Sequence, residues 1–306
     1  MNDAEISLLK KSGQITNKAH KLAKKIIQPG ASLYEVGTKI ENFIKDQGAF
    51  PAFPINLSYN NQAAHNSYSD EEVIINEDMI LKVDIGSQID GYITDSAQTI
   101  IFNKKHELLR EASFKALEDA KKYISENLST AKVSDVGEIV ENKISSYGFR
   151  PICNLTGHFI SIYETHDHPS IPNIKNNIDL KFIDLCKDKW FAIEPFASTG
   201  KGEIFEGPEV FIFQHVEDRP IRNQNARILL EEIKEFHGLP FSEYWVGKNM
   251  SAFDKKFALR ELLKQQIISS YPVLVEKQGV SIAQWETSFA IFNDELIDLV
   301  NIHEFY

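Results

Sequence analysis

The spacing of apolar residues along the chain predicts two helices at its N-terminal end. Apolar side chains recur with the period of an amphipathic helix from Asp3 to Ile27, and Pro29-Gly30 ends that pattern. Ser32 and Glu35 have the spacing of a capping box, in which each side chain bonds the backbone of the other residue. We therefore expect a second helix that begins at Ser32 and ends at Gly48.

Residues 79–103 read as one tight β-hairpin, because two strand-like runs flank the turn-forming pair Asp90-Gly91. A two-residue turn at that pair sets Gly86 opposite Asp95, with Asp84 two positions further along. A turn centred one residue earlier sets Asp84 directly opposite Asp95. In both registers the two aspartates share a face of the hairpin, about 5 to 8 Å apart.

The same order of elements recurs in the second half of the chain. Helical patterns cover roughly 107–127 and 134–147, the second closed by Gly148, and strand-like runs follow near 189–196 and 209–216. Two successions of helix, helix and hairpin indicate a duplicated unit.

A helical insertion interrupts the strand-rich pattern near the C-terminal end. Residues 223–270 carry two helical patterns, whereas 271–276 and 281–292 resemble strands that return to the main sheet. We expect a catalytic body formed by residues 1–222 and 271–306, with 223–270 as an insertion subdomain.

Composition narrows the class of protein. With 306 residues, 42% of them hydrophobic, the chain can bury one large core or one core and an insertion. A formal net charge of −11 argues against general binding of nucleic acid, because phosphate contacts need clustered cations. No apolar run approaches the ~20 residues that cross a bilayer, so we expect a cytoplasmic protein without a membrane partner. Cys153 and Cys186 are expected to be reduced, buried thiols.

The candidate chemistry begins with the two aspartates of the hairpin. Two carboxylates at that distance repel, so each would tend to take up a proton unless a cation lies between them. One or two divalent metals would supply the positive charge. Three further residues in or beside strand-like runs could complete such a site: His158, Glu194 and Glu286. Singly, a histidine of this kind is more often structural, and a glutamate in a strand usually faces solvent. Together, four carboxylates and one imidazole suit Mn, Fe, Co or Zn.

In order and context these five residues resemble the ligand set of the methionine aminopeptidases, specifically the type II branch. Similar segments extend over nearly the whole chain: Phe53-Pro54, Ser58, Asn60-Asn61, Ala63-Ala64-His65, TGHFISIYETH (156–166), FAIEPFASTGKG (191–202) and the stretch from Tyr271-Pro272 to Glu286. A helical insertion ahead of the last ligand separates type II from type I. The long charged N-terminal extension of eukaryotic type II enzymes is absent, which is typical of the short archaeal-type form.

The resemblance implies a pita-bread α+β fold, in which a duplicated helix-helix-hairpin unit surrounds a curved antiparallel sheet with pseudo-twofold symmetry. It also implies two divalent metal ions per chain. Asp84 would bind one ion, His158 and Glu194 would bind the other, and Asp95 and Glu286 would bridge the two. Such a pair lowers the pKa of a shared water, so that hydroxide can attack the peptide carbonyl near neutral pH.

The same resemblance implies roles on the substrate side. Phe53, His65 and Tyr271 would form the wall of the pocket for the methionine side chain, and His65 and His166 would contact the scissile peptide without binding metal. Glu194 would act as general base. The expected substrate is the N-terminal methionine of nascent peptides, with transient proximity to the ribosome, no specific nucleic acid and a monomeric enzyme.

Two departures from the family pattern bear on metal preference or pocket shape. Thr287 follows the last glutamate where the family often has histidine, and Asp167-His168 replaces a pair of small residues. Two rival functions remain open: a proline-directed peptidase of the same fold, such as prolidase or aminopeptidase P, and a catalytically silent binding protein like the proliferation-associated relatives. Five other histidines stand in helical or surface contexts and are expected to be solvated: His20, His106, His215, His237 and His303.

Overall fold

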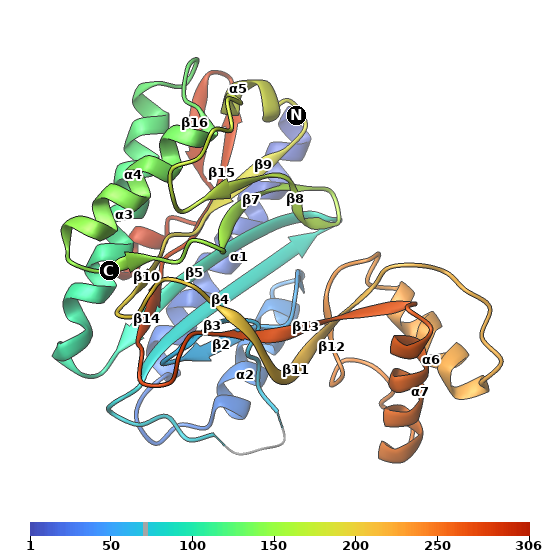
Figure 1. The fold of residues 1–306 in the computed structure, drawn as a ribbon. Coiled ribbons are helices and arrows are strands. Elements are labelled where there is room, and N and C mark those ends of the chain that lie inside the picture. Colours follow the sequence, from blue (N-terminus) through green and yellow to red (C-terminus); the bar gives the residue numbers. More distant parts are fainter. Residues whose placement is uncertain (70–72) are drawn as a thin grey trace.

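The computed structural model describes residues 1–69 and 73–306 (Figure 1). Its helices are α1 (Asp3–Ile26), α2 (Leu33–Asp46), α3 (Glu107–Glu126), α4 (Val133–Ser146), α5 (Phe182–Leu185), α6 (Gln224–Lys234) and α7 (Ala252–Lys264). Its strands are β1 (Phe50–Pro51), β2 (Asn56–Tyr59), β3 (Gln62–Ala64), β4 (Ile80–Ile89), β5 (Tyr92–Ile101), β6 (Arg150–Pro151), β7 (Thr156–Ser161), β8 (Glu164–Pro172), β9 (Trp190–Ile193), β10 (Phe196–Ser198), β11 (Phe205–His215), β12 (Phe241–Ser242), β13 (Ile268–Val275), β14 (Ile282–Gln284), β15 (Thr287–Phe292) and β16 (Glu295–Asp298).

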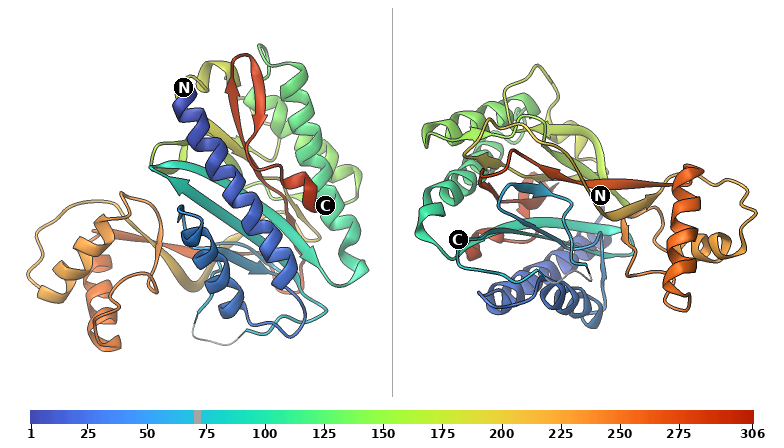
Figure 2. Two further views of the ribbon diagram at one scale, coloured as in Figure 1. Left: turned by 180° about the vertical axis from the view of Figure 1, so that it is seen from behind. Right: turned by 60° about the horizontal axis from the view of Figure 1, so that its bottom comes forward.

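Long helices cover the outer side of the antiparallel strands. The back view shows α1 running across the β4–β5 hairpin, with α2 beside it (Figure 2). On the other half, α3 packs against β10 and β14, and α4 packs against β6 and β8. Two large apolar clusters fill the spaces between these helices and the strands. The strand face that the helices leave uncovered is therefore the one available for a site.

The hairpin adopts the first of the two predicted registers. Gly86 lies opposite Asp95 and Asp84 lies opposite Ala97, so the register that paired the two aspartates directly is wrong. Asp90 and Gly91 both have positive φ, 52° and 84°, which matches the tight turn expected at this pair. Asp84 and Asp95 share one face, as both registers required.

The first helix pair is confirmed, but its capping box is elsewhere. Asn2 Oδ1 accepts from the backbone N–H groups of Ala4 and Glu5, while Glu5 Oε2 accepts from the backbone N–H of Asn2. Ser32 is the N-cap of α2, yet its side chain makes no capping hydrogen bond. The backbone there pairs with residues 73–75 instead, which fixes the entry into α2 without the side chain.

The two halves repeat the same order of elements. Helices α2 and α4 are each 14 residues long, and each is followed by a glycine with positive φ and then by a two-residue strand. The glycines are Gly48 (φ 78°) and Gly148 (φ 81°), a backbone region that favours glycine. The repeated helix pair predicted from the sequence is thus present. The expected second hairpin is wrong, because the strands near 189–196 and 209–216 lie in different sheets: β9 pairs with β7 and β15, whereas β11 pairs with β12 and β13.

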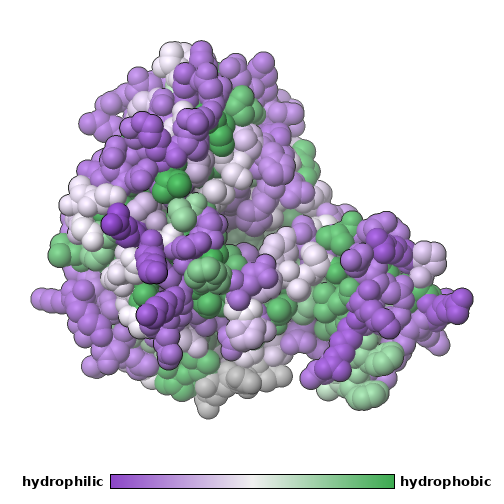
Figure 3. Space-filling view, in the orientation of Figure 1, coloured by the Kyte–Doolittle hydropathy of each residue, from purple (hydrophilic) through white to green (hydrophobic). Residues whose placement is uncertain are grey.

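Helices α6 and α7 form a lobe at the far end of β11 and β13 (Figure 1). They bury their own apolar cluster, which includes Leu229, Ile233 and Leu262. The helical content expected for 223–270 is present, whereas the status of this lobe as a separate subdomain stays a prediction. Figure 3 shows the lobe projecting from a body whose visible face is mostly hydrophilic, with apolar residues in scattered groups. None of the helices in the described ranges has the length and apolar character needed to cross a membrane.

Two predictions about buried and exposed residues are wrong. His20 is fully buried and His106 is only 7% exposed, although both were expected to be solvated. Cys153 is exposed, because it follows β6 in a turn, whereas Cys186 is buried as expected. His20 is satisfied by β5: its Nε2 lies 2.8 Å from Ser96 Oγ, and Gln98 Nε2 lies 2.9 Å from its Nδ1. Burial lowers the pKa of His20 to about 3.

This buried imidazole predicts a specific loss of stability in acid. His20 stays neutral in the folded protein but takes a proton below pH 6.5 once unfolded, so its contribution is complete above pH 6.5 and is lost as the pH falls toward 3. The free energy of unfolding should fall by about 1.4 kcal/mol per pH unit on this account. In urea denaturation between pH 6.5 and 4, His20→Gln should show a shallower fall than the wild type. His237→Gln, at an exposed position, should not; equal slopes in His20→Gln and wild type would contradict the assignment.

Candidate metal centre

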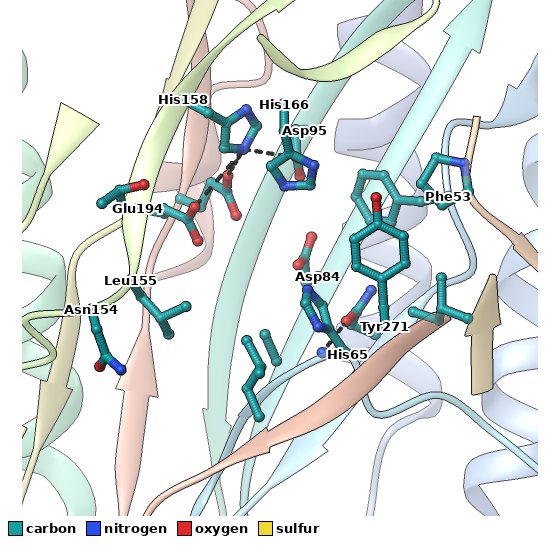
Figure 4. Close-up of a pocket in the computed structure, with 17 residues that line it drawn as sticks. Phe53, His65, Asp84, Asp95, Asn154, Leu155, His158, His166, Glu194 and Tyr271 are labelled. Atoms are coloured by element: carbon teal, nitrogen blue, oxygen red, sulfur yellow. Dashed lines mark hydrogen bonds and ion pairs between the residues drawn. The ribbon is translucent and has the colours of Figure 1, made fainter. Parts of the chain in front are cut away.

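Five side chains predicted to bind metal come from four separate regions of the chain and converge on the uncovered strand face (Figure 4). They lie on β4, β5, β7, directly after β9, and between β14 and β15: Asp84, Asp95, His158, Glu194 and Glu286.

Strand pairing fixes this convergence. Glu286 and Ala97 exchange two backbone hydrogen bonds, 3.0 and 3.2 Å long, which hold Glu286 beside the hairpin. His158 lies opposite Ala192 in the pairing of β7 with β9. Side chains two residues apart on one strand share a face, so these registers direct the ligand candidates to the same side.

His158 is surrounded by carboxylates. Its Nε2 lies 3.5 Å from Asp95 Oδ2, 3.6 Å from Glu286 Oε1 and 3.8 Å from Glu194 Oε1. Single ligand atoms of Asp95, His158 and Glu286 all lie within 4.8 Å of one another. A cation that binds such atoms at about 2.0–2.2 Å would fit between them.

The electrostatics of the cluster require positive charge. Burial raises the pKa of Asp84 to about 7. Burial first, and then the charges of neighbouring carboxylates, raise the pKa values of Asp95, Glu194 and Glu286 well above their usual range. Burial also lowers the pKa of His158 to about 4, so its ring is neutral and does not offset the acids. Protons or cations must therefore neutralise the cluster.

Unpaired oxygens indicate that cations fit here. Asp84 Oδ1, Asp95 Oδ1 and Glu286 Oε1 are buried and have no hydrogen-bond partner among the described residues. An unsatisfied buried carboxylate oxygen is costly, whereas a divalent cation would use it as a ligand. The donor set, four carboxylates and one imidazole, is of the kind that Mn, Fe, Co and Zn accept.

Several polar side chains that support the cluster were missed by the sequence analysis. Gln284 Nε2 lies 3.1 Å from Glu286 Oε2 and 3.4 Å from Glu194 Oε2, and thus donates to two of the acids. Asn173 Nδ2 donates to the backbone carbonyl of Glu194, at 3.1 Å. Ser288 Oγ accepts from the N–H of Asp95 and donates to its carbonyl, both at 2.8 Å. Gln284 could have been identified from the sequence, because it precedes the ligand candidate Glu286 by two positions and residues two apart in an extended segment share a face.

The cluster forms the floor of a pocket of about 310 Å³. Each residue predicted on the substrate side, namely Phe53, His65, His166 and Tyr271, lines this pocket. Four apolar lining residues were not predicted: Leu155 ahead of β7, Ile212 on β11, Leu274 on β13 and Pro240 from the lobe. The pocket thus combines an acidic floor with largely apolar walls.

Local packing holds the wall residues. His65 has an unusual φ of 63°, and its Nδ1 lies 3.1 Å from the carbonyl oxygen of Pro272. Its ring meets that of Tyr271 edge-on, with centroids 5.3 Å apart. The ring of Phe53 lies over Gly86, where an added Cβ would be only 2.3 Å from a ring carbon. Gly86 therefore leaves the space that Phe53 occupies.

His166 stands beside the cluster rather than within it. Its ring centroid is 4.4 Å from that of His158. His166 keeps solvent access at the open side of the pocket, yet desolvation by the surrounding protein first, and then the neighbouring rings of His158 and His65, lower its pKa below its usual range. A neutral imidazole at this position can donate one hydrogen bond into the pocket.

The departures from the family pattern point away from the pocket. Thr287 Oγ1 donates to Asp298 Oδ1 on β16, at 3.0 Å. Asp167 forms an ion pair of 2.9 Å with Lys189, and neither it nor His168 is among the residues that line the pocket. No direct contact of these residues with the pocket follows from the structure.

Comparisons with known proteins agree with this geometry. A model of the metallopeptidase family M24 matches residues 7–219. The methionine aminopeptidase of Pyrococcus horikoshii is 40% identical over 294 residues, covering 95% of this chain and 98% of that protein. That of Thermococcus onnurineus is 41% identical over 284 residues, covering 92% of this chain and 95% of that protein.

Among solved structures, a thermophilic Arx1 has a TM-score of 0.84 at 16% identity, covering 100% of this chain and 94% of that one. A methionine aminopeptidase from Thermotoga maritima has a TM-score of 0.69 at 20% identity, covering 98% of both chains. At these identities the structures support the fold alone. They support the pita-bread α+β fold with a curved antiparallel sheet.

Proposed function

The chain belongs to metallopeptidase family M24, within its archaeal-type methionine aminopeptidases, and on that premise we propose that two divalent cations are held by the following five side chains: Asp84, Asp95, His158, Glu194 and Glu286. Asp95 and Glu286 would supply ligand oxygens to both ions. Asp84 would complete one site, and His158 and Glu194 would complete the other.

One observation carries this proposal: four carboxyl groups with raised pKa values, two of them buried and two partly buried, gather round a neutral imidazole. Such a cluster is destabilising unless it is neutralised. The buried oxygens of Asp84, Asp95 and Glu286 that have no described partner supply ligand atoms.

The protein side of the reaction follows from the positions of these groups. When bound, the two cations lower the pKa of a shared water, so that hydroxide is available near neutral pH. Glu194 acts as general base, taking up the proton on its carboxylate and passing it to the leaving amine. His166 donates its ring N–H to the oxygen of the carbonyl under attack, where negative charge develops.

The pocket selects the first residue of the substrate. Phe53, His65 and Tyr271 form its aromatic wall, and the unpredicted apolar lining residues close it. Methionine suits such a site, because its unbranched thioether side chain is flexible and makes favourable contacts with aromatic rings. We propose that the substrates are nascent peptides in the cytoplasm, that the enzyme acts as a monomer in transient proximity to the ribosome, and that residues 223–270 form an insertion subdomain.

The test compares two short peptides with the metal content of the same sample. Met-Ala-Ser should be cleaved to free methionine, whereas an Xaa-Pro peptide should not be cleaved at a comparable rate. Activity should disappear with a chelator and return with Mn or Co, at two ions per chain. Preferential cleavage of the Xaa-Pro peptide would favour the prolidase alternative, and activity that withstands metal removal would contradict the proposal.

A further inference from the structure

A buried carboxylate outside the metal centre joins three distant parts of the chain. Glu41, on α2, is only 2% exposed. Its Oε2 accepts from Tyr68 Oη, at 2.7 Å, and from Trp245 Nε1 of the lobe, at 2.8 Å. Its Oε1 accepts from the backbone N–H of Ile55, at 3.2 Å. No step of the proposed reaction uses this group.

Two of these contacts, those with Tyr68 and Ile55, lie in the body and hold one wall of the pocket. Ile55 and Tyr68 lie near the two ends of the segment 53–68, which carries both Phe53 and His65. Within the segment, Asn56 Oδ1 accepts from the backbone N–H of His65 at 2.6 Å, and Ser67 Oγ donates to the carbonyl of Ile55 at 2.8 Å. A shift of Ile55 would therefore reach His65 through its neighbour Asn56.

The contact with Trp245 reaches a second part of the pocket lining. Trp245 follows Pro240, which lines the pocket, and its backbone N–H donates to the carbonyl of Ser242 at 3.0 Å. Ser242 lies opposite Ile212, another lining residue, in the pairing of β12 with β11. Next to Pro240, Leu239 packs in the same apolar cluster as Phe53. Trp245 is thus linked through Ser242 to the lining residue Ile212, and Pro240 lies on the same short segment of the lobe.

We propose that Glu41 is a positioning residue that sets the shape of the pocket for the substrate's first side chain, by joining two parts of its lining through Ile55 and Trp245. The inference rests on the proposed function, in which this pocket receives methionine. Only a carboxylate suits the position, because all three partners donate and glutamine would offer one of them an N–H group instead of an acceptor.

Ring packing between Tyr68 and Tyr244 supports the same connection between the body and the lobe. The ring of Tyr68 stacks on that of Tyr244, with centroids 5.8 Å apart and planes at 26°. Gly37 on α2 makes room for Tyr68, since a Cβ there would lie 2.2 Å from the tyrosine ring. The side chain that bonds Glu41 from the body therefore also packs against the lobe, so the walls are joined by packing as well as by the carboxylate.

The experiment compares Glu41→Gln with the wild type in the metal-loaded enzyme. With Met-Ala-Ser, KM should rise by about tenfold while kcat stays within about twofold, because lost hydrogen bonds to a charged group displace the walls and leave the metal centre intact. Selectivity, measured as the ratio of kcat/KM for Met-Ala-Ser to that for Leu-Ala-Ser, should fall. Trp245→Phe and Tyr68→Phe, each removing one donor and keeping an aromatic side chain, should change KM and selectivity in the same direction.

The controls separate positioning from general stability. Tyr123→Phe removes a hydroxyl that donates to the carboxylate of Asp135, far from the pocket, and should leave KM and selectivity unchanged. If the Glu41 and Trp245 variants lower only the melting temperature, with KM and selectivity as in the wild type, the inference is overturned. Should Glu41→Gln fail to fold, the Trp245→Phe and Tyr68→Phe variants decide the matter alone. A wild-type enzyme that does not cleave Met-Ala-Ser at all would instead overturn the proposed function.

Discussion

Asp95→Asn and Glu286→Gln are each expected to lower turnover by about a thousandfold or more and to reduce the metal bound per chain below two ions. Each change removes one negative charge and one ligand oxygen from a residue proposed to bind both cations, and without both cations the shared water would keep a high pKa. Steady-state hydrolysis of Met-Ala-Ser and metal analysis of the same samples measure both effects.

A matched control is available in another buried glutamate. Glu276 is 5% exposed and lies outside the cluster, where it accepts from Ser198 and from the backbone of the following loop. Glu276→Gln should keep two ions and the wild-type turnover of the folded fraction. Unchanged activity in both Asp95→Asn and Glu286→Gln would refute the dinuclear mechanism.

His166→Ala is expected to lower kcat by about 10²–10³-fold while metal content stays at the wild-type level. The imidazole stands beside the ligand cluster, and its proposed task is to donate a hydrogen bond to the oxygen on which charge develops. Turnover with Met-Ala-Ser and metal content per chain are measured together.

His168→Ala serves as the control, because this histidine is exposed and is not among the residues that line the pocket. Its turnover should stay within about twofold of the wild type. Loss of metal from His166→Ala would contradict the assignment and make His166 a ligand.

Local patterns were sufficient to predict the long helices and the β4–β5 hairpin, whereas the roles of the ligand candidates came from the family resemblance. The alternation of the β4 and β5 residues and the Asp90-Gly91 turn predicted that Asp84 and Asp95 share a face, since both features depend on neighbours in sequence. The choice between the two registers needed the structure. The capping box at Ser32 was wrong because backbone pairing with residues 73–75 replaced the side-chain bond.

Contacts between distant segments explain most of what the sequence did not reveal. Trp245 reaches Glu41 across 204 positions, and Pro240 reaches the pocket from the lobe, so no short spacing marks either residue. His20 occupies a helix that looks amphipathic. Its burial depends on Ser96 and Gln98 of β5, which lie 76 and 78 positions further along the chain. Tertiary packing decides such positions, not local propensity.

Diffraction from crystals soaked in manganese, recorded near the manganese absorption edge, tests the metal centre most directly. Two anomalous peaks are expected, each about 2.0–2.3 Å from ligand atoms of the five proposed side chains, with Asp95 and Glu286 contacting both peaks. The absence of anomalous scattering among those side chains would contradict the metal centre on which the proposed function depends.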